Sequence, residues 1–86
     1  MKIIIIGKSG VGKSNLSDLL RNLIFKLDKD SKIMVDDHDR QIKEFGSGQD
    51  NHTIRVARDD SNINITDYDI EIRIKTNKFK DWFDNL

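Results

Sequence analysis

The chain has 86 residues, no cysteine and no proline, and its 15 basic residues balance its 15 acidic residues. This length predicts a single domain over residues 1–86, because domains usually hold about 100–200 residues. The absence of cysteine excludes disulfides and thiolate metal sites. A zero net charge gives no overall attraction to nucleic acid or to a membrane surface. The apolar run at residues 3–6 is also far too short to cross a membrane, so we expect a cytoplasmic protein with neither kind of partner.

The first 35 residues predict one strand–helix–strand unit. Residues 2–6 are a β-branched run bounded by Gly7, which is typical of a strand buried on both faces. Apolar residues then recur at helical spacing, namely Leu16, Leu19, Leu20, Leu23, Ile24 and Leu27. This spacing predicts an amphipathic helix from Lys13 to about residues 28–30. Residues 33–35 form a second short apolar run, so the unit has the pattern of an α/β protein.

The pattern changes after residue 37. Ile42 and Phe45, three residues apart, predict a short helix over residues 39–45 that ends at a Gly-Ser-Gly break. Apolar and polar residues then alternate through three runs that contain Ile54 and Val56, Ile63 and Ile65, and Ile70, Ile72 and Ile74. Alternation indicates one face in solvent, so we interpret this part as an antiparallel hairpin region. Arg55, Arg58 and Arg73 fall on these runs and form either a solvated face or a surface for an anion or a partner.

The last ten residues contain Phe79, Trp82, Phe83 and Leu86, a spacing that predicts a short helix with its aromatic side chains packed on the sheet. The predicted fold is therefore α/β: a strand–helix–strand unit extended by an antiparallel hairpin region and a short C-terminal helix.

Residues 7–14 read G-K-S-G-V-G-K-S and match G-x-x-x-x-G-K-[ST] at every fixed position. Glycines allow positive φ angles, so that successive backbone N–H groups can curl around an anion. The motif leads into a helix N-terminus, which also favours negative charge. Lys13 would place a positive charge on the β and γ phosphates, and Ser14 would offer its hydroxyl to Mg²⁺. The alternative is a glycine turn that only links strand to helix, which leaves Gly12, Lys13 and Ser14 unexplained.

On this motif, and on the predicted strand before it and helix after it, roughly the first 45 residues resemble the P-loop NTPase superfamily. The resemblance implies binding of ATP or GTP with Mg²⁺. It assigns the nucleotide contacts to Gly7, Lys8, Ser9, Gly10, Val11, Gly12, Lys13, Ser14 and Asn15. Lys13 would also act in catalysis if the nucleotide is turned over.

A carboxylate is needed opposite such a loop, either for Mg²⁺ or for proton abstraction. Asp36 and Asp37 follow the second apolar run, which is the general form of a Walker B element, and we expect Asp36 to ligate Mg²⁺ together with Ser14. Asp67, after the more polar run at residues 63–66, is a second option. Asp36 or Asp37 can also serve simply as the N-cap of the helix expected over residues 39–45.

Residues 36–41 resemble more closely the polynucleotide-kinase and zeta-toxin branch of P-loop kinases. In that branch an Asp-rich segment after the second strand is followed by an Arg, as at Arg40 here. The resemblance implies that Asp37 is the base that takes the proton from an acceptor hydroxyl and that Arg40 contacts an acceptor phosphate. The sequence departs from the branch in having no recognisable arginine-rich lid.

Three functions are compatible with these residues. The first, which we favour, is a small nucleotide-binding or regulatory module with little or no turnover. The second is a minimal phosphotransferase that uses Mg²⁺-ATP with Asp37 as base. The third is a vestigial fold that acts only as a protein-interaction domain. Besides the nucleotide, the expected partners are another protein or a second copy of the chain bound through a sheet edge.

Overall fold

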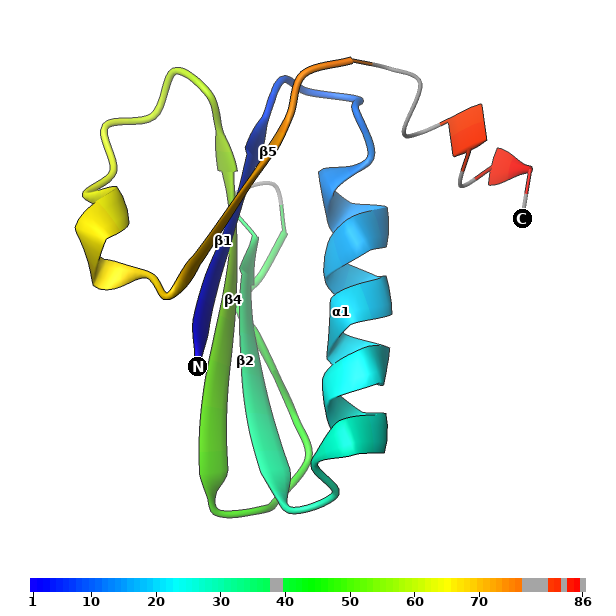
Figure 1. The fold of residues 1–86 in the computed structure, drawn as a ribbon, viewed down its shortest axis with the longest axis vertical. Helices are drawn as coiled ribbons and strands as arrows, with labels where there is room; N and C mark the ends of the chain where they lie inside the picture. The colour runs from blue at the N-terminus through cyan, green and yellow to red at the C-terminus, as the bar shows by residue number, and fades with distance from the viewer. Residues whose placement is uncertain (38–39, 77–80, 83, 86) are drawn as a thin grey trace.

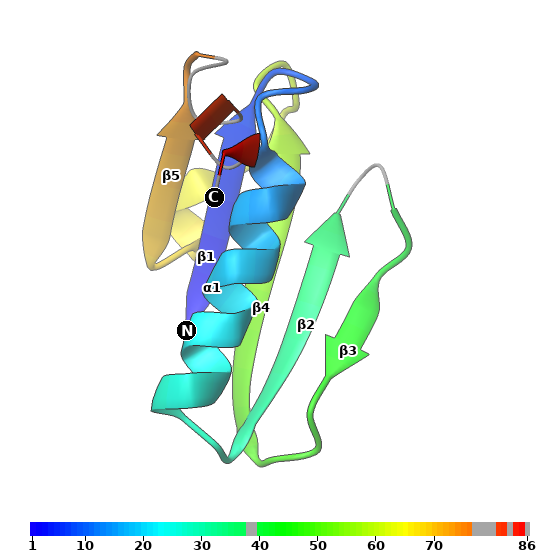
Figure 2. The ribbon, with the colours of Figure 1, turned by 90° about the vertical axis from the view of Figure 1, so that its right-hand side faces the viewer.

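The computed structural model describes residues 1–37, 40–76, 81–82 and 84–85. Its elements are β1 (Lys2–Gly7), α1 (Lys13–Leu27), β2 (Ser31–Asp37), β3 (Lys43–Phe45), β4 (Asp50–Arg58), the 3₁₀ helix η1 (Ile65–Asp67) and β5 (Ile70–Ile74). The strands form one mixed sheet in the order β3-β2-β4-β1-β5, with α1 on one face (Figures 1 and 2). The predicted α/β class is confirmed, and so are the first strand, the long helix and the second strand. No helix in the described ranges is long and apolar enough to cross a membrane.

The hydrophobic core lies on both faces of β1. On the face toward α1, the side chains of Ile3 and Ile5 join a cluster with Val11, Leu16, Ile33, Ile54, Val56 and Ile74. On the opposite face, Ile4, Ile6 and Ala57 are buried beneath Ile63 and Tyr68. Ile63 and Tyr68 come from the connection between β4 and β5, which crosses this face. All four isoleucines of β1 are at most 5% exposed, as the continuous apolar run predicted.

The antiparallel pairing expected for residues 54–74 is wrong. β4 pairs in parallel with both β1 and β2, and β5 pairs in parallel with β1. The antiparallel pair of the sheet is instead β2 with β3. Alternation had indicated one solvated face, and strands that α1 covers on one side alternate whatever their direction. The alternation therefore indicates burial on one face and does not indicate strand direction.

The prediction of a helix over residues 39–45 is also wrong, because residues 43–45 form the strand β3. Phe45 lies opposite Ile33 of β2, and the Arg21 guanidinium stacks 4.0 Å from the centre of its ring. Ile42 is 61% exposed, so it does not share a buried face with Phe45. The C-terminal helix was expected from Phe79, Trp82, Phe83 and Leu86. Phe79, Phe83 and Leu86 lie outside the described residues, and Trp82, which the structure describes, is 55% exposed.

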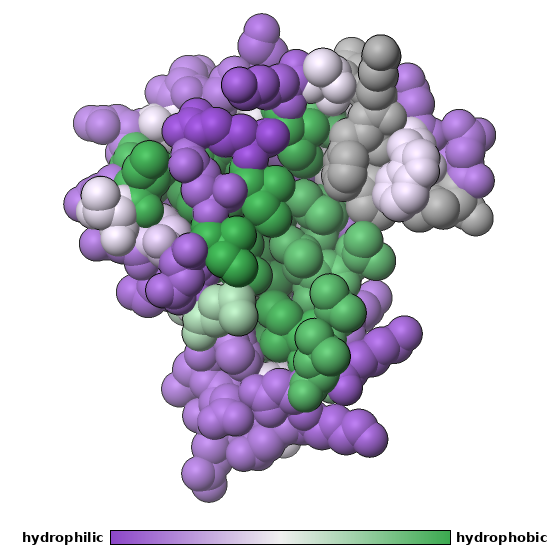
Figure 3. Space-filling model, viewed as in Figure 1, coloured by the Kyte–Doolittle hydropathy of each residue, from purple (hydrophilic) through white to green (hydrophobic). Residues whose placement is uncertain are grey.

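One apolar strip of α1 stays in contact with solvent. Leu19, Leu23 and Leu27 follow one another at four-residue intervals and are all exposed, as is Ile70 of β5. Hydrophobic side chains gather over α1 and toward β5 in the space-filling view (Figure 3). α1 thus leaves part of its own apolar surface, and part of the apolar surface of β5, exposed to solvent.

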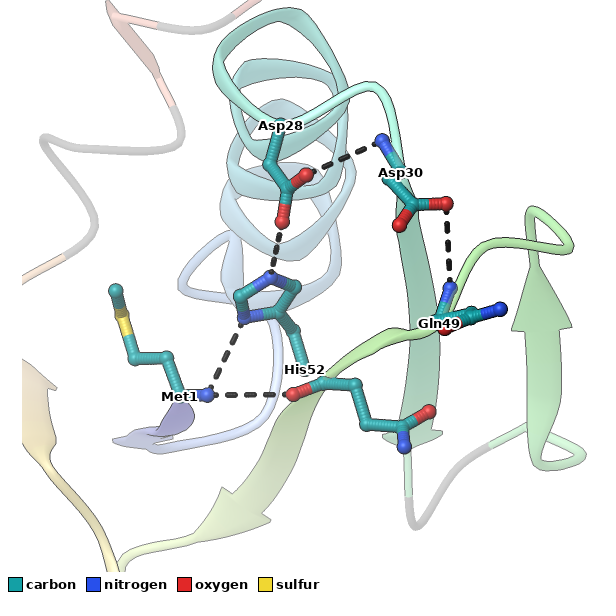
Figure 4. Close-up of polar contacts among 6 residues, drawn as sticks. Met1, Asp28, Asp30, Gln49 and His52 are labelled. Atoms are coloured by element: carbon teal, nitrogen blue, oxygen red, sulfur yellow. Dashed lines mark hydrogen bonds and ion pairs between the residues drawn. The ribbon is translucent and has the colours of Figure 1, made fainter.

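A polar network at the end of the sheet away from residues 7–14 joins the C-terminus of α1 to the start of β4 (Figure 4). His52 Nε2 lies 3.1 Å from Asp28 Oδ2, and His52 Nδ1 lies 3.2 Å from the Met1 amino group. Asp28 Oδ1 accepts the Asp30 amide at 3.1 Å. The hydrogen bond from His52 is the main cause that lowers the pKa of Asp28, and the charge of Asp28 in turn raises the pKa of Asp50.

Replacing His52 by Ala should lower the unfolding temperature at neutral pH, and this loss should shrink in acid. The pKa of Asp28 is lowered in the folded state from its ordinary value of 3.8. Its contribution to stability is therefore complete above pH 3.8 and disappears as the pH falls through the lower, folded pKa. Thermal unfolding of wild type and His52→Ala across this range measures the effect. A difference that stays constant far below pH 3.8 would contradict the assignment to Asp28.

Candidate functional site

The loop of residues 7–14 lies at the carboxyl edge of the parallel strands. It leaves β1 and enters α1 on one face of the sheet, whereas the connection that follows β4 crosses the other face to reach β5. The chain thus departs in opposite directions from the neighbouring strands β1 and β4. Crevices at such points, outside the carboxyl ends of the strands, are where open α/β sheets bind ligands. The register places Gly7 between Arg58 and Ile74 at this edge.

Three glycines shape this loop for different reasons. Gly10 and Gly12 have φ angles of 82° and 100°, in the left-handed region that favours glycine. Gly7 is required for space, because a Cβ there would lie 2.9 Å from both Ile74 O and Val11 Cγ2. A Cβ on Gly10 would meet nothing within 4 Å, so the loop is open to solvent at that point.

The N-terminus of α1 faces this loop without a side-chain cap. Gly12 is the N-cap residue and offers no side-chain acceptor, and the first turn of the helix contains no acidic residue. The first N–H groups of a helix need acceptors from outside the helix, and its dipole favours an anion there. The first turn of α1 is therefore suited to a phosphate or another anion.

Lys13 folds back onto the loop that precedes it. Its side chain is 5% exposed, and Nζ donates to Gly7 O at 2.8 Å and to Lys8 O at 2.7 Å. These two bonds keep the ammonium group inside the curve of the loop, where a bound anion would lie. An ammonium group has three N–H donors, so these two bonds leave one to donate to an anion.

Ser14 and Asp37 join the first turn of α1 to the carboxyl end of β2. Ser14 Oγ donates to Asp37 Oδ2 at 2.7 Å, and Asp37 is 4% exposed. Asp36 lies on the opposite face of β2, as successive strand residues do, and its carboxylate is 3.7 Å from Arg55 Nη1. The structure thus brings Asp37 to Ser14 and places Asp36, the expected Mg²⁺ ligand, away from it.

A cavity of about 250 Å³ opens beside this pair. It is lined by Ser14, Ser17, Asp18, Arg21, Val35, Asp37, Arg40, Gln41, Lys43 and Phe45. Ser17 Oγ and Arg21 Nε are buried and have no hydrogen-bond partner in the structure. Sequence reasoning missed Ser17 and Arg21, although their spacing of three and seven residues from Ser14 puts all three on one side of the helix.

The other expected residues divide between the surface and the core. Lys8, Ser9 and Asn15 are exposed around the loop. Val11 is 3% exposed and belongs to the core, so it can offer a ligand only its backbone.

Arg40 and Asp67, the two remaining candidates, line separate hollows on opposite faces of the sheet. The Arg40 side chain is half exposed, with Nε 4.0 Å from Asp37 Oδ2, so it lies beside the cavity. Asp67 ends η1 and lines its hollow together with Lys2 and Asp36, on the face of the sheet away from α1, so it is not beside Ser14.

Comparison with known proteins adds little to this site. No family model matches the chain, and no curated protein matches it significantly. A search of solved structures finds the crystal structure of a proposed cell surface hydrolase from Lactobacillus plantarum WCFS1, with 18% identity and a TM-score of 0.31. The match covers 77% of this chain and 28% of that protein. A likeness this weak carries no argument about fold or function.

Replacing Ser14 by Ala should destabilise the protein by about 1.5–3 kcal/mol, the range for a hydrogen bond to a charged group. The reason is that the buried Asp37 carboxylate loses the donor at 2.7 Å. Urea unfolding without nucleotide measures this loss. Asn15→Ala, at the exposed neighbouring position, is the control and should change stability little. Equal losses in the two variants would contradict a stabilising role for this bond.

Proposed function

We propose that the chain binds the Mg²⁺ complex of a nucleoside triphosphate, ATP or GTP, with its phosphates on the loop of residues 7–14. One observation carries the proposal. The Lys13 ammonium, the Ser14 hydroxyl and the uncapped N-terminus of α1 meet on one short loop at the carboxyl edge of the sheet. Each of these groups favours a phosphate oxygen or its cation.

The contacts of Lys13 support binding of the terminal phosphates. Its two acceptors are backbone carbonyls of the loop itself, so the charge is held in place without a neutralising carboxylate. A phosphate on the loop would thus meet a buried positive charge as well as the N–H groups of α1. Charge-assisted hydrogen bonds of this kind are roughly twice as strong as neutral ones.

The pair of Ser14 and Asp37 fits Mg²⁺. Proteins usually hold this ion through one or two carboxylates, together with substrate phosphates and water. No cluster of three or more His, Cys, Asp or Glu side chains occurs in the part of the chain that the structure describes. The hydroxyl of Ser14 and the carboxylate of Asp37 would therefore hold the ion jointly with the nucleotide, and Asp37 takes the role that the sequence had suggested for Asp36.

The groups at the loop all act on a bound phosphate, and none of them requires that phosphate to be transferred. We therefore place binding, as a small regulatory module, ahead of turnover. Phosphotransfer is a second candidate, because the cavity beside Ser14 is also lined by Asp37 and Arg40. In that reaction Asp37 would take the proton of an acceptor hydroxyl, whose oxygen would bond to the γ phosphorus while the bond to the nucleoside diphosphate breaks.

Calorimetric titration with ATP and GTP, each with Mg²⁺, tests the binding proposal. Wild type should release or absorb heat with at least one of them, and Lys13→Ala should lose most of this affinity because the buried ammonium is gone. Lys26→Ala, in the last turn of α1, removes an equal charge away from the loop and is the matched control. A saturating nucleotide, at about 100 times its dissociation constant, should also stabilise wild type by about 2.7 kcal/mol in thermal unfolding. If folded wild type binds neither nucleotide, the proposal is wrong and the protein-interaction domain without a ligand is the remaining alternative.

Asp37→Asn separates a metal-binding role from a catalytic one. Asparagine can still accept the Ser14 hydrogen bond but has no charge for Mg²⁺. We expect the affinity for Mg²⁺-ATP to fall to the affinity measured in EDTA, with little phosphate release by either protein. Asp36→Asn, on the other face of the strand, should leave the Mg²⁺ dependence intact. If Asp37→Asn instead binds Mg²⁺-ATP as wild type does and abolishes a measurable transfer, the phosphotransferase assignment replaces ours.

A further inference from the structure

The strand β5 forms an open edge of the sheet. It pairs with β1 on one side, and the strand order places no described strand beyond it. The opposite edge strand, β3, has only three residues, two of them charged, a common protection against pairing with another chain. β5 is longer, has no proline and presents Ile70 to solvent. The edge that is open to a partner is therefore that of β5.

The two faces of β5 have opposite character. Ile70, Ile72 and Ile74 pair with Ile3, Ile5 and Gly7 of β1 and share the α1 face of the sheet. The intervening Glu71 and Arg73 point to the other face, where Arg73 Nε contacts Glu71 Oε1. The strand thus has an apolar side, only partly covered by α1, and a side that carries one negative and one positive charge.

This sequence is self-complementary when two copies run antiparallel. With Ile72 opposite Ile72 of a second copy, Ile70 of each copy faces Ile74 of the other. Glu71 of each copy likewise faces Arg73 of the other, so each of these pairs occurs twice. Opposite charges and apolar pairs directly across from each other stabilise neighbouring strands, and like charges destabilise them. A parallel pairing in register would set Glu71 against Glu71 and Arg73 against Arg73. Charge complementarity therefore favours an antiparallel copy of the same chain as the occupant of this edge.

We propose that β5 is a homodimerisation edge, at which two copies pair antiparallel about Ile72 and form one ten-stranded sheet. The contact is isologous, so it closes as a two-fold dimer and does not propagate into a fibre. Glu71 and Arg73 of both copies form one alternating network of four charges. Asp69 and Lys75 would extend the pattern by one pair, although Asp69 Oδ2 already accepts the Lys2 amide.

The size and charge of the chain are consistent with this partner. A domain of 86 residues buries a smaller share of its surface than a larger domain does, and association is a common way for small domains to bury more. The formal net charge of zero means that two copies do not repel each other overall. Because the two β5 strands run in opposite directions, the two loops of residues 7–14 lie at opposite ends of the joined sheet. Dimerisation thus needs no bound nucleotide, and the proposal is independent of the proposed function.

Charge reversal provides the test, read by sedimentation equilibrium over a series of protein concentrations. Wild type should sediment at twice the 10.0 kDa of one chain. Glu71→Arg and Arg73→Glu should each be monomeric, because both variants set like charges opposite each other. When these two variants are mixed, every charge again faces its opposite, and a one-to-one heterodimer should form. The double variant Glu71→Arg/Arg73→Glu is self-complementary once more and should dimerise alone.

Recovery of the dimer in the mixture and in the double variant shows that the single variants are folded, so monomers cannot be attributed to misfolding. Lys29→Glu, at an exposed position before β2, is the control for a change of net charge and should stay dimeric. A wild type that is monomeric at every concentration overturns the proposal. A dimer that survives both single reversals also overturns it, because the contact must then lie elsewhere, for example on the strip of Leu19, Leu23 and Leu27.

Discussion

A single long helix has to cover one face of a five-stranded sheet in the part of the chain that the structure describes. α1 lies over the middle of that face, so β1 and the inner part of β4 are buried while β2 and β5 are partly covered. The opposite face is covered only where the β4–β5 connection brings Ile63 and Tyr68 against it. One helix is too small to cover this face completely. The alternating polar pattern of the later strands, the exposed leucines of α1 and the partial burial of β5 are the result.

The candidate site depends on the direction of the strands as well as on the loop sequence. Because β1 and β2 both run parallel to β4, their carboxyl ends meet at one edge, and α1 starts there because it follows β1 directly. Residues far apart in the chain are thereby brought within hydrogen-bond distance, as Ser14 and Asp37 are at 2.7 Å. Had β2 run the other way, its carboxyl end would lie at the far edge, and the loop would have no carboxylate from this strand beside it.

The sequence predicted the parts of the fold that local periodicity determines: β1, α1, the middle of β2 and the glycine-rich loop. Strand direction and β3 were missed because they depend on pairing between distant residues. The choice between Asp36 and Asp37 was within reach, however. Ile33 and Val35 pack toward α1, and a period of two carries that face on to Asp37. Helical spacing alone puts Ser17 and Arg21 on the same side of α1 as Ser14, but only the position of β2 beside α1 shows that this side lines a cavity.

The loop and the open edge of the sheet are connected through Gly7. Its backbone lies so close to β5 that a Cβ would come within 2.9 Å of Ile74 O, so the carboxyl end of β5 forms part of the support behind the loop. Lys13 Nζ in turn donates to the carbonyl of Gly7. A contact that fixes β5 therefore restricts the same backbone that positions the ammonium group. If the two equilibria are coupled, linkage requires the effect to be reciprocal: whatever pairing of β5 does to phosphate affinity, a bound phosphate does equally to the pairing.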